Sequence, residues 1–262
     1  MRTALITGGA QGIGAAVARK FLGEGFSGVL LVDRNAEKLA AMQKQIGKAA
    51  EIYVGDLRDK RTPAGAVAKA VKSFGRLDVL VNAAGNTERC GIADTTAEAF
   101  DRLFEVNVKA PLFMMQEAAK HMVPAKSGVI INVASMLVYG GPPNLTTYSA
   151  SKSALMTLSR SAANTFKRDG IRVFCVNLGW TLTDGEHELQ TTFHKQPENW
   201  AEEIGARMPF GRLITADDVA GLCAFLVSPP AQMMTGAVID YEQMPLGTFD
   251  IHPALSPQDP QR

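Results

Sequence analysis

Residues 3–14 read TALITGGAQGIG, a short apolar run that passes directly into a glycine-rich turn. The run TALIT (3–7) has the length and composition of a buried strand, and a helical apolar pattern begins near Gly12. Glycine permits a tight strand-to-helix turn and lets backbone N–H groups approach a pyrophosphate, which the positive end of the following helix attracts. The stretch therefore predicts the start of a nucleotide-binding βαβ unit. Its frame, T-G-x-x-x-G-x-G, differs from the G-x-G-x-x-G fingerprint, and a glycine-rich turn alone is a weak signal.

The same alternation continues along the rest of the chain. Short runs rich in β-branched residues are separated by segments with the length and apolar spacing of helices. The runs are apolar at successive positions, as in strands that a parallel sheet buries on both faces. We therefore expect an α/β fold, namely a three-layer, Rossmann-like, doubly wound parallel sheet of seven strands. After the first, the expected strands are GVLLVD (28–33), EIYVGD (51–56), DVLVN (78–82), GVIINVAS (128–135), RVFCVN (172–177) and GAVID (236–240), and the helices begin near Gly12, Ala36, Thr62, Ala97, Tyr148 and Ala216.

Two segments depart from this regular alternation. Within 97–123, Pro111 and the polar Asn107 interrupt an apolar helical pattern and predict a break or kink. The stretch 180–212 contains no expected strand, and its aromatic residues predict a lid or substrate loop with short helices, with an Ω-like structural insertion as the alternative. We assign residues 1–252 to a single domain and expect the Pro-rich, polar tail 253–262 to be loosely ordered.

Composition limits the classes of partner. The 262 residues include 27 basic and 26 acidic ones, so no net field favours nucleic acid, an anionic membrane or an acidic partner, and small molecules are the expected ligands. The three cysteines are widely spaced and predict neither a disulfide framework nor a metal cluster. His187 and His194 show no metal-ligand spacing, so we expect no metal site. Without a leader pattern or an apolar stretch of roughly 18 residues, a soluble, cytoplasmic protein is expected.

Polar side chains follow three of the expected strands. Asp33 ends the second strand, 19 residues after Gly14, where a carboxylate would accept hydrogen bonds from the adenosine ribose and repel the extra phosphate of NADP. Arg34 beside it leaves NADP open, although neighbouring residues at a strand end point in opposite directions. Asp56 and Asn82 follow the next two strands, at the edge where such sheets bind ligands. The sequence therefore favours NAD over NADP.

Residues 147–152, TYSASK, place Tyr148 and Lys152 four positions apart, and hence on one face of a helix. Taken alone, the pair fits a solvated tyrosine and lysine on an ordinary helix surface. The chemical interpretation is that the lysine charge favours the phenolate, lowers the tyrosine pKa toward neutral pH and makes the phenol a general acid or base. Motifs elsewhere in the chain are needed to choose between the surface interpretation and the catalytic one.

Together these motifs resemble the short-chain dehydrogenase/reductase family, in its shorter single-domain form, over essentially the whole chain. The glycine turn is similar to the family's cofactor turn, and NAAG (82–85) to its cofactor-supporting motif. Asn107, Ser135, Tyr148 and Lys152 match all four members of its catalytic tetrad, with Ser135 thirteen residues before Tyr148. The resemblance implies that Ser135 holds the substrate oxygen and that Asn107 holds a water linked to Lys152. Seen singly, Ser135 also fits a helix cap and Asn107 a helix kink.

The resemblance also implies a set of cofactor contacts, with Asp56 at the adenine and Gly179 and Thr181 at the carboxamide. Two positions depart from the family pattern, because Phe174 and Leu178 stand where an asparagine and a proline are usual. Leu178 relaxes the backbone beside the nicotinamide, and Phe174 is expected in the core. The full set of expected cofactor contacts is Gly8, Gln11, Gly12, Ile13, Gly14, Asp33, Asp56, Leu57, Asn82, Ala83, Gly85, Tyr148, Lys152, Gly179 and Thr181.

The implied activity is that of an NAD-dependent oxidoreductase that interconverts a secondary alcohol, such as a sugar or polyol, and its ketone. The alternatives are an NADP-linked carbonyl or oxoacyl reductase and a catalytically silent, NAD-binding regulator. Family members are commonly tetramers, so a homotetramer or dimer is expected on the helices that hold Asn107 and Tyr148, although a buried core explains the same apolar faces. The candidate substrate contacts are Asn86, Thr87, Met136, Leu137, Tyr139, Asn144, Leu145, Trp180, His187, Phe193 and Trp200.

Overall fold

A computed structural model of the chain describes residues 2–246. Met244 and Leu246, two apolar residues of the C-terminal segment, are exposed at its end. Phe249 and the tail expected to be loose, 253–262, lie outside the described residues.

The main sheet has seven strands, all paired in parallel, in the order β3-β2-β1-β4-β5-β6-β9. The expected doubly wound α/β fold is confirmed, because the order reverses between β1 and β4 and the strands match the seven predicted runs. Two further strands, which the sequence analysis missed, form a separate two-stranded sheet. The strands are β1 (Thr3–Thr7), β2 (Gly28–Asp33), β3 (Ala50–Val54), β4 (Val79–Asn82), β5 (Gly128–Val133), β6 (Ile171–Leu178), β7 (Thr181–Leu182), β8 (Ile214–Thr215) and β9 (Val238–Tyr241).

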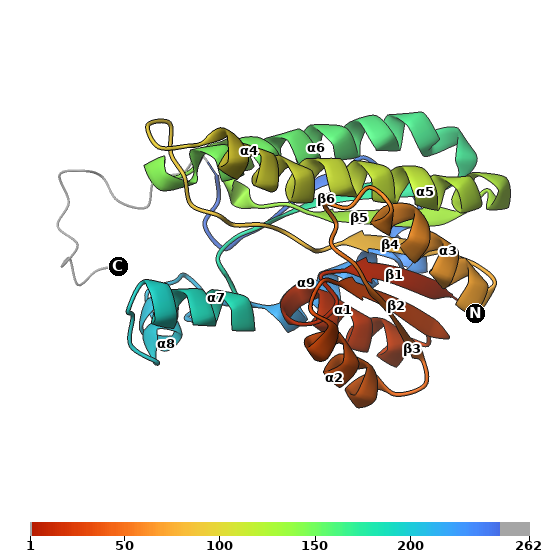
Figure 1. The fold of residues 1–262 in the computed structure, drawn as a ribbon, viewed down its shortest axis with the longest axis horizontal. Coiled ribbons are helices and arrows are strands. Elements are labelled where there is room, and N and C mark those ends of the chain that lie inside the picture. The colour runs from red at the N-terminus through yellow and green to blue at the C-terminus, as the bar shows by residue number, and fades with distance from the viewer. Residues whose placement is uncertain (1, 247–262) are drawn as a thin grey trace.

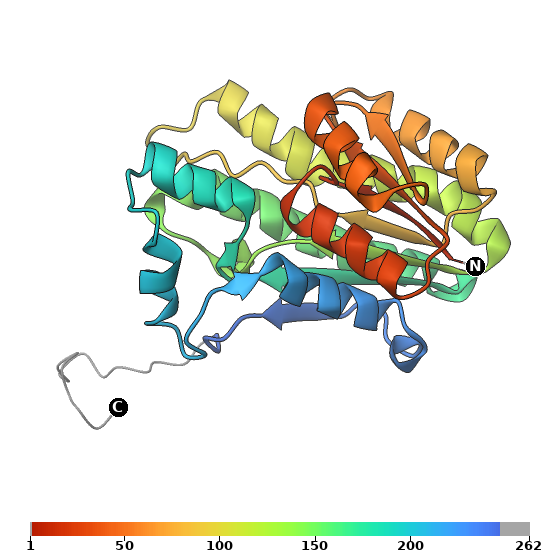
Figure 2. The same cartoon turned by 90° about the horizontal axis from the view of Figure 1, so that it is seen from below.

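Helices cover both faces of the main sheet, as Figures 1 and 2 show. One core cluster joins α1, α2 and α9 to one face, and a second joins α3, α5 and α6 to the other. Phe174 is fully buried in the first cluster, as expected. The helices are α1 (Gly12–Gly23), α2 (Ala36–Ile46), α3 (Thr62–Phe74), α4 (Ala97–Phe104), α5 (Ala110–Ala125), α6 (Thr146–Phe166), α7 (Asp184–Glu188), α8 (Trp200–Gly205) and α9 (Ala216–Leu226).

The expected break within 97–123 is a π-helical turn, Glu105–Lys109, between α4 and α5. Asn107 lies in this turn and is fully buried, while Pro111 falls in the first turn of α5. A π-helical turn changes the direction of one side chain within a continuous helix, and such turns are frequent at functional sites.

The segment 180–212 forms β7, α7, a second π-helical turn (Leu189–Phe193) and α8. Figure 1 shows α7 and α8 standing apart from the main layers, on the side away from the N-terminus. Trp200 is buried and its ring stacks on that of Trp180, with 5.7 Å between centroids. The imidazole of His187 is hydrogen-bonded to Glu198 and accepts from the indole N–H of Trp200. The short helices expected here are present, and His187 has a packing role among them.

No helix in the part of the chain that the structure describes has the length and apolar character needed to cross a membrane. The three cysteines, Cys90, Cys175 and Cys223, are buried and free.

Candidate active site

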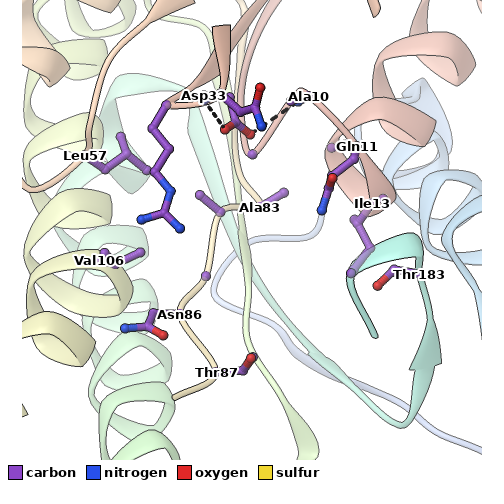
Figure 3. Close-up of a pocket in the computed structure, with 18 of the residues that line it drawn as sticks. Ala10, Gln11, Ile13, Asp33, Leu57, Ala83, Asn86, Thr87, Val106 and Thr183 are labelled. Atoms are coloured by element: carbon purple, nitrogen blue, oxygen red, sulfur yellow. Dashed lines mark hydrogen bonds between the residues drawn. The ribbon is translucent and has the colours of Figure 1, made fainter. Parts of the chain in front are cut away.

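A cleft of about 780 Å³ runs from the end of β2, over the glycine-rich turn, to the start of α7. Figure 3 shows Gln11, Ile13 and Thr183 along one wall and Leu57, Val106 and Asn86 along the other. The turn approaches its neighbours closely: Gly8 has a φ of +67°, and a Cβ on Gly14 would collide with the Gly8 carbonyl oxygen. A volume of this size and a turn free of side chains fit a dinucleotide, with its pyrophosphate at the start of α1.

The structure brings most of the expected cofactor contacts into this cleft and leaves five outside its lining. The ten that line it are Gly8, Gln11, Gly12, Ile13, Gly14, Asp33, Asp56, Leu57, Ala83 and Gly85, and the five that do not are Asn82, Tyr148, Lys152, Gly179 and Thr181.

Asn82 is buried beneath the cleft instead of facing it. Its side-chain N–H donates to Asn132 on β5 at 2.8 Å, and Asn132 in turn donates to Ser159 on α6 at 2.9 Å. Hydrogen bonds between buried side chains hold neighbouring elements in one arrangement. Asn82 therefore ties β4, which leads into the NAAG segment, to β5 and through it to α6.

Thr183 takes the place in the cleft that the sequence analysis gave to Thr181. The Thr181 hydroxyl donates to the carbonyl of Gly179, while Thr183 lines the cleft and would contact a Cβ on Gly12 at 3.4 Å. Thr183 also caps α7, because its hydroxyl accepts from the backbone N–H of Glu186. The spacing of Thr183 and Glu186, T-x-x-E, is a helix-start signal that could have identified it.

The end of the cleft beside β2 carries charges of both signs. The Asp33 carboxylate accepts from the backbone N–H groups of Ala10, at 3.4 Å, and Asn35, at 3.0 Å. Arg34, the neighbour of Asp33, lines the same cleft. Basic residues that the sequence analysis did not assign to this end, Lys38 and Arg58, line it as well.

Asp56 is held by Arg58, and this pair was also missed. The guanidinium donates to the carboxylate through two nitrogens, at 2.7 and 3.0 Å, and lowers the pKa of Asp56. Arg58 is only two residues from Asp56, and a D-x-R spacing after a strand is too common to be a signal by itself.

Tyr148 lies near the start of α6 and is 9% exposed. Its ring belongs to a small apolar cluster with Cys90 and Leu103. Burial raises the pKa of the Tyr148 phenol to about 12; the Ser135 hydroxyl, as its hydrogen-bond partner, opposes this rise, and the negative charge of Glu186 adds to it. This raised pKa keeps the phenol protonated at neutral pH, so that it can donate a proton.

Ser135 has two roles in the structure. Its hydroxyl accepts from the backbone N–H of Leu137 at 3.2 Å and so caps the short 3-10 helix Met136–Tyr139 that follows β5. This cap fixes the side chain at the end of the sheet, where its hydroxyl lowers the pKa of the Tyr148 phenol. The cap that seemed an alternative to catalysis is thus what positions the hydroxyl.

Lys152 lies one turn beyond Tyr148 on α6 and is 4% exposed. Its Nζ donates to the carbonyl oxygen of Val133 at 2.9 Å, and burial lowers its pKa to about 8. The expectation that Lys152 lowers the Tyr148 pKa is wrong for this structure, because burial of the phenol dominates and raises that pKa.

Asn107 fastens the segment that follows NAAG. Its side-chain oxygen accepts from the backbone N–H of Asn86 at 2.8 Å, and its N–H donates to the Asn86 carbonyl and to Ser151 Oγ, both at 2.9 Å. A Cβ on Gly85 would lie 3.5 Å from Lys152 Nζ and 3.7 Å from Asn107 Oδ1. The cleft floor at Gly85 thus lies directly over the lysine and the asparagine, which joins the cofactor cleft to the tetrad.

Comparisons with known proteins agree with this geometry. The family described as short chain dehydrogenase matches residues 2–193, and the chain belongs to the short-chain dehydrogenase/reductase family. The chain is 36% identical over 237 residues to sorbitol dehydrogenase of Cereibacter sphaeroides, and the aligned region covers 88% of this chain and 91% of that protein. It is also 36% identical over 235 residues to galactitol 2-dehydrogenase of Agrobacterium fabrum (strain C58 / ATCC 33970), covering 87% and 90%.

Among solved structures, YwfH, an NADPH dependent reductase involved in bacilysin biosynthesis, superposes with a TM-score of 0.86 and 27% identity, over 95% of this chain and 99% of that one. The protein is thus an oxidoreductase that acts on CH–OH groups, in a family that binds a nicotinamide dinucleotide.

Proposed function

We propose that the protein oxidises a sugar alcohol or a similar secondary alcohol to its ketone with NAD, and catalyses the reverse reaction. The observation that carries the proposal is that Gly85 of the cleft lies directly over Lys152, one helical turn from the buried Tyr148, whose pKa the Ser135 hydroxyl lowers. The likeness to a sorbitol dehydrogenase and a galactitol dehydrogenase supports a polyol as substrate.

Each side chain of the site has a separate role in the reaction. A bound nicotinamide supplies the acceptor or donor of the hydride. Ser135 holds the substrate oxygen within reach of the phenol and stabilises the charge that develops on it. Tyr148, whose raised pKa favours the protonated phenol, donates a proton to the oxygen of a ketone, and its conjugate base removes the proton from an alcohol. Asn107 holds the Asn86 segment, which forms one wall of the cleft.

We infer NAD as the preferred cofactor because the Asp33 carboxylate, at the end of β2, would repel a phosphate on the adenosine ribose. NADP is a second candidate, favoured by Arg34, Lys38 and Arg58 along the same part of the cleft and by the likeness to an NADPH dependent reductase.

We also propose that the protein is a homo-oligomer in the cytoplasm. Phe100 on α4 and Leu112 and Phe113 on α5 are about two-fifths exposed, and a second copy would cover them. Three buried, free cysteines fit a reducing compartment. Size-exclusion chromatography with light scattering tests the oligomer: a monomer mass at working concentration would contradict it.

A substrate and cofactor panel tests the proposed activity. The purified protein is incubated with sorbitol, galactitol, simple secondary alcohols and their ketones, each with NAD and with NADP, and the change in reduced cofactor is followed. The proposal expects NAD-dependent oxidation of a polyol at a higher kcat/KM than that of the simple alcohols. Turnover confined to ketones with NADPH would support the reductase alternative instead.

A further inference from the structure

Glu186 brings a carboxylate into the cleft from the substrate loop. It lies on α7, whose N-cap, Thr183, packs against the glycine-rich turn, so the loop is fixed to the cofactor side of the site. Glu186 is partly buried and lines the cleft, and its negative charge makes a minor contribution to the raised pKa of the Tyr148 phenol. The carboxylate therefore faces the cleft from the loop that the sequence predicts to contact the substrate.

The side chain of Glu186 is held in place by the loop. Its Oε1 accepts from the indole N–H of Trp180 at 2.9 Å and from the amide of the buried Gln190 at 2.8 Å. These bonds leave Oε2 without a partner among residues 2–246, so it has its hydrogen-bonding capacity available to a ligand. Two donors on a single oxygen also fix the orientation of the other.

Among the described residues, the acidic side chains that line the cleft without an ion pair are Asp33, Glu186 and Glu188. Asp56 is paired with Arg58, and Glu88 is paired with Arg102 at 2.6 Å. No ion pair involves Glu186 within the described part of the chain, so its negative charge acts on whatever enters the cleft.

We propose that Glu186 determines substrate specificity by accepting a hydrogen bond from a hydroxyl group next to the reacting carbon and by repelling anionic substrates. The substrate class that follows is a neutral polyhydroxylated alcohol with adjacent hydroxyl groups, an inference that rests on the proposed polyol dehydrogenase function. A carboxylate is a strong acceptor for a hydroxyl, and a partly buried acceptor left unpaired discriminates against an alcohol that lacks that hydroxyl. An anionic substrate would meet an uncompensated like charge.

The test compares Glu186→Gln with Asp184→Asn, a variant that removes an exposed carboxylate from the same helix outside the cleft lining. Glutamine keeps an oxygen that accepts from Trp180 and Gln190, so the loop contacts survive while the charge is removed. The fluorescence of the two tryptophans, Trp180 and Trp200, checks that their stacked arrangement persists.

Three substrates are compared: a hexitol that the wild type oxidises, cyclohexanol as an alcohol without a neighbouring hydroxyl, and the hexonate that corresponds to the hexitol. We expect Glu186→Gln to raise KM for the hexitol about tenfold while kcat changes less than about threefold, since one charged hydrogen bond is lost. Cyclohexanol, measured as substrate or inhibitor at the pH optimum of each protein, keeps its wild-type constant, and the kcat/KM for the hexonate rises relative to that for the hexitol. Asp184→Asn resembles the wild type.

Several results would overturn the inference. A wild type that oxidises hexitols, with the same KM in Glu186→Gln, overturns the role of Glu186 and leaves the proposed function standing. An equal loss for hexitol and cyclohexanol assigns Glu186 to loop structure and overturns its role in recognition. A wild type that oxidises no polyol with either cofactor overturns the proposed function and this inference together.

Discussion

Lys152 and Tyr148 lie one helical turn apart on α6, with the lysine Nζ 5.8 Å from the centre of the tyrosine ring and donating to the carbonyl of Val133. The ammonium is thus bound to the end of β5 and lies over the face of the phenol ring. In this arrangement, burial sets both pKa values, raising that of Tyr148 to about 12 and lowering that of Lys152 to about 8. Because the pKa of Tyr148 is raised, the neighbouring lysine does not by itself convert the phenol to the phenolate.

The lowered pKa of Lys152 makes folding stability depend on pH. Between about pH 8 and the unfolded value of 10.5, the unfolded chain keeps the proton that the folded chain has lost, so stability rises with pH across this window. Removing the group in Lys152→Met removes this contribution. We expect the wild type to gain free energy of unfolding relative to Lys152→Met from pH 8 to 10, by up to about 1.4 kcal/mol per pH unit.

Chemical denaturation of both proteins across this range measures the effect. Lys69→Met is the matched control, because Lys69 also donates to a backbone carbonyl, that of Ile52, but its side chain is 38% exposed. Parallel stability curves for the wild type and Lys152→Met would contradict the assigned burial of the charge.

The hydrogen bonds of Asn107 predict a stability effect larger than that of an ordinary asparagine. Asn107→Ala leaves the backbone N–H and carbonyl of Asn86 without their partner, and should lower the free energy of unfolding by about 3 kcal/mol. It should also lower kcat, because the cleft wall at Asn86 loses its anchor. Thermal unfolding is compared with Asn164→Ala, which removes an exposed asparagine bonded to Lys167 and should be nearly neutral. Equal changes in the stability of the two variants would contradict the anchoring role of Asn107.

Asp33 predicts the cofactor preference. Asp33→Ser removes the carboxylate that would bind the ribose hydroxyls and leaves Arg34 and Lys38 in the cleft. We expect NADH to bind about tenfold more weakly and NADPH more tightly than in the wild type. Fluorescence titration of each reduced cofactor measures both constants, with Asp101→Ser, on exposed α4 surface, as the control. Unchanged NADPH affinity would count against repulsion by Asp33.

The charge of Glu186 predicts a shift in the pH dependence of turnover. Because this negative charge raises the pKa of Tyr148, its loss in Glu186→Gln should lower that pKa. Oxidation, which needs the deprotonated phenol, should then begin at lower pH than in the wild type. The profile of kcat/KM for cyclohexanol or a hexitol tests this, and a profile displaced to higher pH would contradict the electrostatic contact. Asp184→Asn provides the comparison for a carboxylate on the same helix.

Most of the fold could be predicted because its signals are local. All seven strands of the main sheet were readable as apolar runs, and the interruption at Asn107 and Pro111 was readable from residue type. The strands β7 and β8 are two residues each, too short to leave a periodic pattern, and they pair Thr181 with Ile214, which are far apart in the sequence. Such pairings depend on tertiary packing and leave no local signal.

In the candidate site too, some features follow from local motifs and others depend on tertiary packing. The glycine turn and the positions of Ser135 and Tyr148 follow from motifs with fixed spacing. The basic residues at the end of the cleft beside β2, namely Arg34, Lys38 and Arg58, come from separate segments that only the fold brings together. The pKa of Tyr148 was predicted in the wrong direction, because spacing on a helix reports which groups share a face, whereas burial depends on the Cys90 and Leu103 cluster packed over the ring.

The assignment of Tyr148 as the proton donor and acceptor is the central claim, and its most direct test is turnover by Tyr148→Phe beside its affinity for NADH. The variant keeps the buried ring and loses only the hydroxyl, so NADH binding and thermal stability should stay near wild-type values. Turnover of the best alcohol in the panel should fall by about 10²- to 10⁴-fold, the contribution of a positioned general acid or base. A Tyr148→Phe protein that binds NADH and turns over at the wild-type rate would contradict the account.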